Sequence, residues 1–138
     1  MKFYRSLVVV STILISACAS QASRDIGFDK LAPRKAEQAL NNGVRLYEDG
    51  ELKTAQKNLQ EALNLGLTFD SEKVSAHKYL AFIYCASNQE RQCRDEFRRA
   101  FEIDQEFKLD RTEIGHPLWG PVYNSVRADL LSKGRIKP

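Results

Sequence analysis

An internal repeat is the feature that most constrains the fold of this chain. When residues 79–103 are shifted back by 38 positions they lie over residues 41–65, and residues of like size coincide. The matched pairs are Gly43 and Ala81, Leu46 and Tyr84, Gly50 and Asn88, Ala55 and Cys93, Leu59 and Phe97, and Ala62 and Ala100. Gly50 and Asn88 tolerate a left-handed backbone, which favours a turn between two helices. The pattern therefore predicts one helical hairpin used twice.

Each hairpin is expected to contain two short amphipathic helices held closely together by facing small residues. Gly43 would face Ala55 in the first hairpin, and Ala81 would face Cys93 in the second. The order small, large, turn, small, large, small resembles the tetratricopeptide repeat, although the period is longer than the usual ~34 residues. This resemblance implies an all-α fold with two tetratricopeptide-like hairpins in an α-α superhelix.

The hydrophobic periodicity predicts five helices, with a helical domain over residues 33–132. The expected helices begin at Pro33, at Glu51, after a cap at Asp70 or Ser71, near Glu90, and at Pro121. A repeat stack needs a terminal cap, so we expect the last helix to serve as a C-terminal capping helix, with Trp119 and Tyr123 packed beneath it. Residues 133–138 form a basic tail that we expect to be solvated.

Residues 1–17 have the pattern of a lipoprotein signal peptide. Lys2 and Arg5 precede an apolar run at residues 7–15, which is too short to span a bilayer because spanning needs roughly 20 residues. The run ends in Ile15-Ser-Ala-Cys18, which resembles the bacterial lipobox. A secretory signal with a chance cysteine is the alternative. Residues 18–32 have little periodicity and are expected to form the lipidated N-terminus and a flexible tether.

The lipobox resemblance implies a covalent anchor on Cys18, made of a diacylglycerol on the sulfur and an N-acyl chain such as palmitate on the freed amine. Several acyl chains anchor a protein stably, whereas one alone is marginal. Residue 19 is Ala rather than Asp, which by the same resemblance implies the outer membrane, with the folded part facing the periplasm. No other cofactor is expected.

Charge and motifs argue against several other classes of function. The net charge is +3, and removal of Lys2 and Arg5 with the signal peptide leaves +1, so the chain lacks the basic footprint of a nucleic-acid-binding protein. His77 and His116 have no second ligand at metal spacing. No catalytic triad or phosphate loop is present. We therefore expect neither an enzyme nor a small-molecule substrate nor a bound metal.

Cys85 and Cys93 stand on either side of the second turn, and two interpretations remain open. In an oxidising periplasm they could form a disulfide. Alternatively, Cys93 is a small packing residue like Ala55 and Cys85 is a free thiol. A catalytic redox pair is disfavoured because the two cysteines stand too far apart in the sequence, whereas reactive pairs have the spacing Cys-x-x-Cys.

A groove lined by the first helix of each hairpin is the candidate binding site for a protein partner. Its candidate residues are Leu40, Val44, Tyr47, Lys78 and Phe82. The alternative is that the C-terminal helix fills this groove. On the outer face of the fourth helix, Glu90 stands four residues before Arg94 and Asp95 four residues before Arg99. Oppositely charged pairs at this spacing are typical of a solvated helix surface.

The complete pattern resembles the small tetratricopeptide-repeat lipoproteins associated with type VI secretion, the TssQ type. The resemblance rests on residues 84–97, YCASNQERQCRDEF, and on the later stretch EIGHPLWGPVY at residues 113–123. It implies an adaptor that binds a secretion component in the cell envelope. An adaptor for cell-wall remodelling enzymes and a pilotin-like assembly lipoprotein are the alternatives, and an enzyme using Cys85 or Cys93 as a thiol is a more distant one.

Overall fold

The described part of the chain is entirely helical apart from its connecting segments. The computed structural model describes residues 31–137, with side chains from Arg34 onward. The predicted signal peptide, Cys18 and the tether as far as residue 30 lie outside the described residues. Six helices follow in order: α1 (Leu31–Glu48), α2 (Leu52–Leu65), α3 (Asp70–Ala86), α4 (Glu90–Ile103), α5 (Arg111–Ile114) and α6 (Gly120–Ser132).

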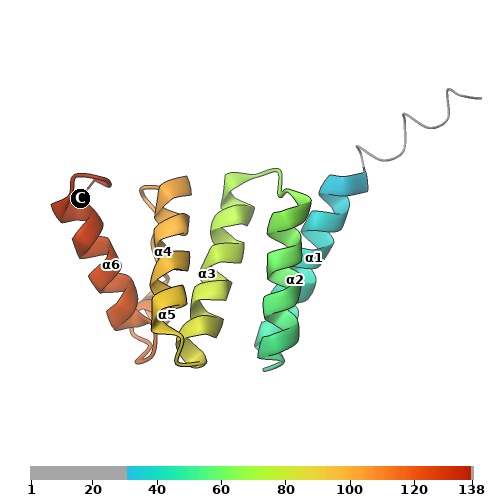
Figure 1. Ribbon diagram of the computed structural model, residues 1–138, viewed down its shortest axis with the longest axis horizontal. Coiled ribbons are helices and arrows are strands. Elements are labelled where there is room, and N and C mark those ends of the chain that lie inside the picture. The colour runs from blue at the N-terminus through green and yellow to red at the C-terminus, as the bar shows by residue number, and fades with distance from the viewer. Residues whose placement is uncertain (1–30, 138) are drawn as a thin grey trace, which may run out of the picture.

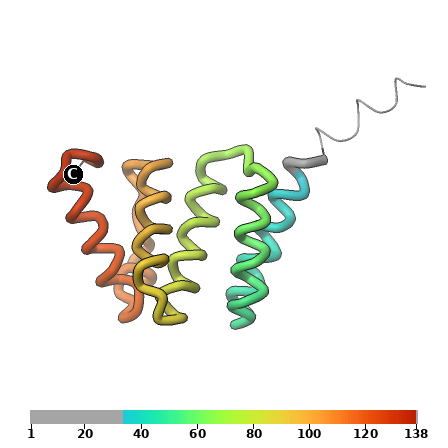
Figure 2. The backbone as a smooth tube through the Cα atoms, viewed as in Figure 1, coloured from blue at the N-terminus to red at the C-terminus, as the bar shows by residue number. Residues whose placement is uncertain are grey.

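The four long helices that come first are packed as two hairpins. α1 packs mainly on α2 and α3 mainly on α4, while α3 also contacts α1 and α2. Figure 1 shows α1 and α2 at one end and α6 at the other, with α3 and α4 between them and α1 partly behind α2. The chain runs up one helix and down the next (Figure 2). The prediction of paired helices is therefore confirmed.

The two turns of the repeat adopt the backbone that the sequence predicts. Gly50 has a φ of 81° and Asn88 a φ of 57°, both in the left-handed region. Asn88 is the one residue other than glycine with a positive φ among residues 31–137. A short polar side chain tolerates this conformation better than most, which explains why Asn can replace Gly here.

Several helix boundaries differ from those predicted. α1 begins at Leu31, so the last two residues of the expected tether are helical. α3 is capped by Phe69 rather than by Asp70 or Ser71, and the Glu72 carboxylate accepts a hydrogen bond from the Phe69 amide at 3.2 Å. That contact satisfies an amide at the helix start, as in one half of a capping box. The short helix α5 was not predicted.

In the first hairpin, the atoms nearest to the space beside Gly43 belong to Leu59 of α2. A Cβ atom at Gly43 would lie 2.7 Å from Cγ of Leu59, so the large side chain of Leu59 fills the space beside this glycine. Ala55, also on α2, is fully buried. At this point, the close packing of α1 on α2 comes from the side chain of Leu59 lying against the backbone of Gly43.

One residue of the predicted basic tail, Ile136, is part of the folded core. Gly134 has a left-handed backbone, and the amide of Arg135 donates to the Leu130 carbonyl at 2.9 Å, which ends α6 and turns the chain back. The side chain of Ile136 is consequently 6% exposed and joins the hydrophobic core. The expectation of a separate tail over residues 133–138 missed Ile136 because Lys133, Arg135 and Lys137 dominate its composition.

Candidate functional site

Cys85 and Cys93 form a disulfide in this structure. The sulfurs are 2.07 Å apart, and both residues are buried where α3 ends and α4 begins. The bond closes the turn that contains Asn88. The disulfide thus links α3 and α4 covalently, and neither cysteine is a free thiol in this structure.

The five predicted groove residues lie on α1 and α3, but they do not line an open channel. Leu40 and Phe82 are buried, while Val44, Tyr47 and Lys78 are partly exposed. Later residues of the chain cover the α3 part of the groove. The indole of Trp119 stacks on Phe82, which is only 2% exposed, and the Glu113 carboxylate lies 2.6 Å from Nζ of Lys78.

The covering segment is α5 with the loop that leads to α6, and short contacts hold its shape. Nε1 of Trp119 donates to the Glu113 carbonyl at 2.9 Å, and the His116 ring stacks on the indole. A Cβ at Gly120 would lie 2.3 Å from the Ile114 carbonyl oxygen, so only glycine fits. This loop, rather than the C-terminal helix itself, fills the α3 part of the groove.

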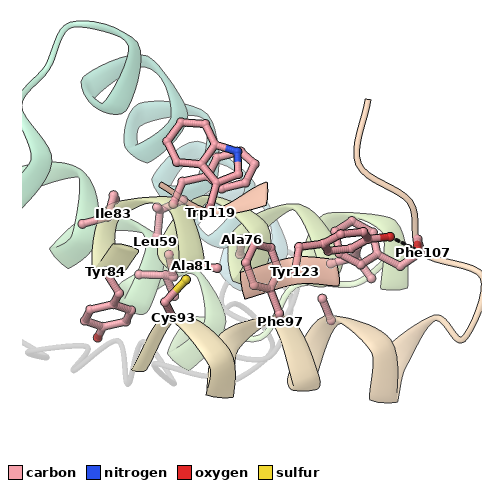
Figure 3. Packing of buried hydrophobic residues seen from close by; sticks show 14 of the residues in the cluster. Leu59, Ala76, Ala81, Ile83, Tyr84, Cys93, Phe97, Phe107, Trp119 and Tyr123 are labelled. Atoms are coloured by element: carbon pink, nitrogen blue, oxygen red, sulfur yellow. Dashed lines mark hydrogen bonds between the residues drawn. The ribbon is translucent and has the colours of Figure 1, made fainter. Parts of the chain in front are cut away.

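Trp119 and Tyr123 therefore have different roles, although both were expected beneath the cap. Tyr123 is a residue of α6 that packs on α4, and its ring lies against Phe97, Phe101 and Phe107. Its hydroxyl donates to the Phe107 carbonyl at 3.0 Å (Figure 3). Burial raises the pKa of Tyr123 above its ordinary value. Trp119 instead packs on the groove side of α3.

The part of the groove that stays accessible is an aromatic strip next to the covered part. Tyr47 of α1 meets Tyr79 of α3 edge to face, with ring centroids 5.2 Å apart, and both side chains are partly exposed. Nζ of Lys78 lies 4.9 Å from the centre of the Tyr79 ring. Burial is the main cause that raises the pKa of Tyr47, and the nearby Tyr79 and Glu113 add to it.

A second site, which the sequence reading missed, lies between α2 and α4 with α3 as its floor. It is a cavity of about 530 Å³, and its polar lining residues include Gln60, Asn64, His77, Tyr84, Gln92 and Glu96. We call it the α2–α4 cleft. Four other cavities among the described residues are smaller, with volumes of about 160–260 Å³.

A buried carboxylate and imidazole form the centre of the α2–α4 cleft. Oε2 of Glu96 lies 2.6 Å from Nδ1 of His77, and the two residues are 5% and 9% exposed. The other oxygen, Oε1, accepts from Arg99 at 2.7 Å. The sequence reading placed His77 correctly on the packed face, but it did not select Glu96. The spacing of Cys93, Glu96 and Ala100 along one face of α4 is the signal that could have found it.

The outer face of α4 has a different ion-pair pattern from the one expected. Arg99 pairs with Glu96 and not with Asp95, which pairs instead with Arg98 at 2.9 Å. The expected pair of Glu90 and Arg94 is present at 3.8 Å. The expected pair of Asp95 with Arg99 is therefore wrong, while the four residues of this face, Glu90, Arg94, Asp95 and Arg99, are all exposed or partly exposed.

The opposite end of the cleft is built around the hydroxyl of Tyr84. Nε2 of Gln60 donates to it at 3.0 Å and Nε2 of Gln56 at 3.3 Å. The oxygen thus accepts two hydrogen bonds from α2. The hydroxyl proton remains available to a ligand because no described residue accepts it.

Within residues 31–137 no helix is both long enough and apolar enough to cross a bilayer. The same range contains no cluster of three or more His, Cys, Asp or Glu residues that could hold a metal ion.

Comparison of the whole chain with protein-family models, with curated proteins and with solved structures gives no match. The site geometry and the sequence resemblances are therefore the basis for the function proposed below.

Proposed function

We propose that the chain is an outer-membrane lipoprotein with two tetratricopeptide-like units, which holds a protein partner at the periplasmic face of the membrane as an accessory component of type VI secretion. The lipobox at Cys18 supports the anchor. The sequence resemblance over residues 84–97 and 113–123 supports the secretion role. The fold supports the adaptor function, because stacked helical hairpins present extended surfaces that bind other proteins.

One observation carries the repeat part of this proposal: the two hairpins close with the same hydrogen bonds at matching positions of the repeat. The Glu51 amide donates to the Leu46 carbonyl at 2.8 Å, and in the second hairpin the Gln89 amide donates to the Tyr84 carbonyl at 2.8 Å. Helix ends of this kind fix the direction in which the chain leaves. Because the chain leaves both hairpins through the same hydrogen-bonded turn, we treat them as two copies of one repeating unit rather than as parts of an irregular bundle.

The proposed partner surface is the accessible aromatic strip of the groove, where Val44, Tyr47 and Tyr79 are partly exposed. Tyr side chains suit such a surface because they combine a large apolar ring with a polar tip at a small entropic cost. The covering segment lies beside the strip, and its residues Ile114 and Leu118 are exposed. A partner helix with an apolar face is the segment that such a groove accepts.

The partner is tested by photo-crosslinking in cells. A photoreactive phenylalanine analogue at Tyr47 should capture a secretion-machine component, whereas the same analogue at Lys57, an exposed residue of α2, should not. Capture of a cell-wall remodelling enzyme at Tyr47 would favour the alternative adaptor function. Equal capture at both positions, or no capture from cells that contain abundant protein, would contradict the assignment of this surface.

The anchor is tested separately by Cys18→Ser. The substitution removes the sulfur that would carry the diacylglycerol, so the protein should move from the membrane fraction to the soluble periplasmic fraction. If the variant fractionates with membranes as the original chain does, the lipid anchor is wrong, whatever the crosslinking shows.

A further inference from the structure

The two cysteines of the disulfide differ in their access to solvent. Cys93 is 0% exposed, whereas Cys85 is 7% exposed. A cavity of about 220 Å³ adjoins Cys85, and Cys93 is not among the residues that line it. The described residues of its lining are Cys85, Asn88, Glu90, Pro117, Leu118 and Val122. A small molecule that enters this cavity therefore meets Cys85, and it does not reach the sulfur of Cys93 while the fold is intact.

The cavity lies between the second turn of the repeat and the loop that leads into α6. Asn88 and Glu90 belong to the turn and the start of α4, while Pro117 and Leu118 belong to the loop. Leu118 is 49% exposed, so it stands at the mouth of the cavity. A water molecule occupies about 30 Å³ in the liquid, so the cavity has room for a thiol group and the carbon that carries it.

The helix ends also make the two sulfurs unequal. Cys85 is the last residue but one of α3, and Cys93 is the fourth residue of α4. The dipole of a helix places partial positive charge at its first turn and partial negative charge at its last turn. Because both side chains are buried, the dipoles decide between them, and a thiolate is more stable at Cys93 than at Cys85. In disulfide exchange the sulfur that forms the more stable thiolate leaves faster.

We propose that Cys85 is the sulfur at which an incoming thiolate attacks this disulfide, with Cys93 as the leaving group. The incoming sulfur bonds to Sγ of Cys85 while the bond to Sγ of Cys93 breaks, and the electron pair of that bond leaves with Cys93. A second thiol then displaces Cys85 from the mixed disulfide. In total, two thiols are oxidised to a disulfide, and their two electrons and two protons reduce the protein disulfide to two thiols.

The same assignment holds when the bond forms again in the folded chain, because the steps then run in reverse. Cys85 carries the mixed disulfide with the oxidising partner, and the thiolate of Cys93 closes the bond by displacing that partner. Cys85 is therefore the modification site, and Cys93 is the resolving cysteine. The class of co-reactant is a thiol, or the corresponding disulfide, whose sulfur stands on a chain narrow enough to enter beside Leu118.

The test is exchange of the full chain, folded and in detergent, with 2-mercaptoethanol as the probe. Excess N-ethylmaleimide stops the reaction early and blocks free thiols. Trypsin cuts after Lys and Arg, so Cys85 and Cys93 fall on separate peptides, residues 79–91 and 92–94. Mass spectrometry should find the mercaptoethanol adduct on residues 79–91 in roughly tenfold or greater excess, because access and leaving group both favour attack at Cys85. In concentrated urea, where both sulfurs are accessible, both peptides should carry it.

A pair of matched variants tests the cavity as the route of entry. Leu118→Trp places a larger side chain at the mouth and should slow exchange of the folded chain severalfold. Ile114→Trp is the control, because Ile114 is 40% exposed on the same covering segment and does not line the cavity. It should leave the rate unchanged. Both original side chains are exposed, so the fold should survive both substitutions.

Four results would overturn the proposal. The adduct could stand chiefly on Cys93, or it could be distributed in the folded chain as it is in urea. The folded chain could form no adduct while the sample in urea reacts, or the two tryptophan variants could react equally fast. Cys18 lies on another tryptic peptide, residues 6–24, so the result depends neither on the proposed anchor nor on crosslinking at Tyr47.

Discussion

The indole of Trp119 lies stacked on the phenyl ring of Phe82, with ring centroids 4.3 Å apart and planes inclined by 23°. This contact joins the loop before α6 to the second hairpin and covers part of a groove whose accessibility the sequence alone left undecided. Stacked aromatic pairs add about 0.5–1.5 kcal/mol to the effect of burial. Trp119 therefore both stabilises the fold and limits how much of the groove a partner can contact.

Trp119→Ala should destabilise the protein by about 3–5 kcal/mol, the usual effect of truncating a buried tryptophan. The indole is 8% exposed, whereas the neighbouring Leu118 is 49% exposed. Leu118→Ala is therefore the matched control and should change stability by about 0.5 kcal/mol or less. Urea unfolding followed by circular dichroism measures both. Equal effects of the two substitutions would mean that Trp119 does not pack on Phe82.

Gly43→Ala should destabilise the first hairpin although alanine favours helices by about 1 kcal/mol over glycine. The added Cβ would meet Leu59 at 2.7 Å, and such overpacking costs about 1–3 kcal/mol. A double-mutant cycle with Leu59→Ala isolates the contact. If the two residues meet as described, the double variant will be less destabilised than the summed single effects. Simple additivity would contradict the packing of Leu59 on Gly43.

Reduction of the disulfide between Cys85 and Cys93 should lower the free energy of unfolding by roughly 2–3 kcal/mol, because the bond closes a loop of about 9 residues. The measurement compares unfolding with and without dithiothreitol. The double variant Cys85→Ala with Cys93→Ala is the control, and its stability should not respond to the reductant. A response of the same size in both proteins would show that the reductant acts elsewhere.

Tyr123→Phe should destabilise by about 1 kcal/mol through loss of the hydrogen bond to Phe107. The substitution should also make the decrease in folding stability at alkaline pH smaller. The raised pKa of Tyr123 means that the folded state keeps the phenolic proton to higher pH than the unfolded chain, whose ordinary value is 10.0. The contribution of this group is therefore complete below pH 10 and falls as the pH rises further.

Melting temperatures between pH 8 and 11 test this pH dependence. Lysines also titrate in this range, but they are the same in both proteins, so the difference between the two curves isolates Tyr123. Parallel curves would show that the Tyr123 phenol titrates alike in the folded and unfolded states.

Ile136→Ala should destabilise by about 2 kcal/mol, since its side chain is buried against the end of α6. Lys137→Ala, one residue further along and exposed, should have almost no effect. Chemical unfolding of the two variants compares them directly. Similar free energies of unfolding for the two variants would mean that residues 133–138 form a solvated tail, as their composition predicts.

The sequence determined the repeating part of this protein. The internal repeat located both hairpins, and Gly50 and Asn88 located the turns, because a left-handed backbone is a local property of one residue type. The same register brought Cys85 and Cys93 to facing helix ends, but it could not decide between a disulfide and a free thiol. These successes all concern neighbours within one hairpin, where spacing along the chain fixes distance in space.

Only the tertiary structure decided what lies on the faces of α3. The stack of Trp119 on Phe82 and the pair of His77 with Glu96 each join residues from separate helices or loops. The charge pattern of α4 does not distinguish the buried Glu96 from the partly exposed Asp95 beside it, since both stand one turn from an arginine; only the spacing of Glu96 from Cys93 and Ala100 points to the inward face. Which of the two faces inward depends on how α4 is rotated against α3, and that rotation is set by the packing of the whole core.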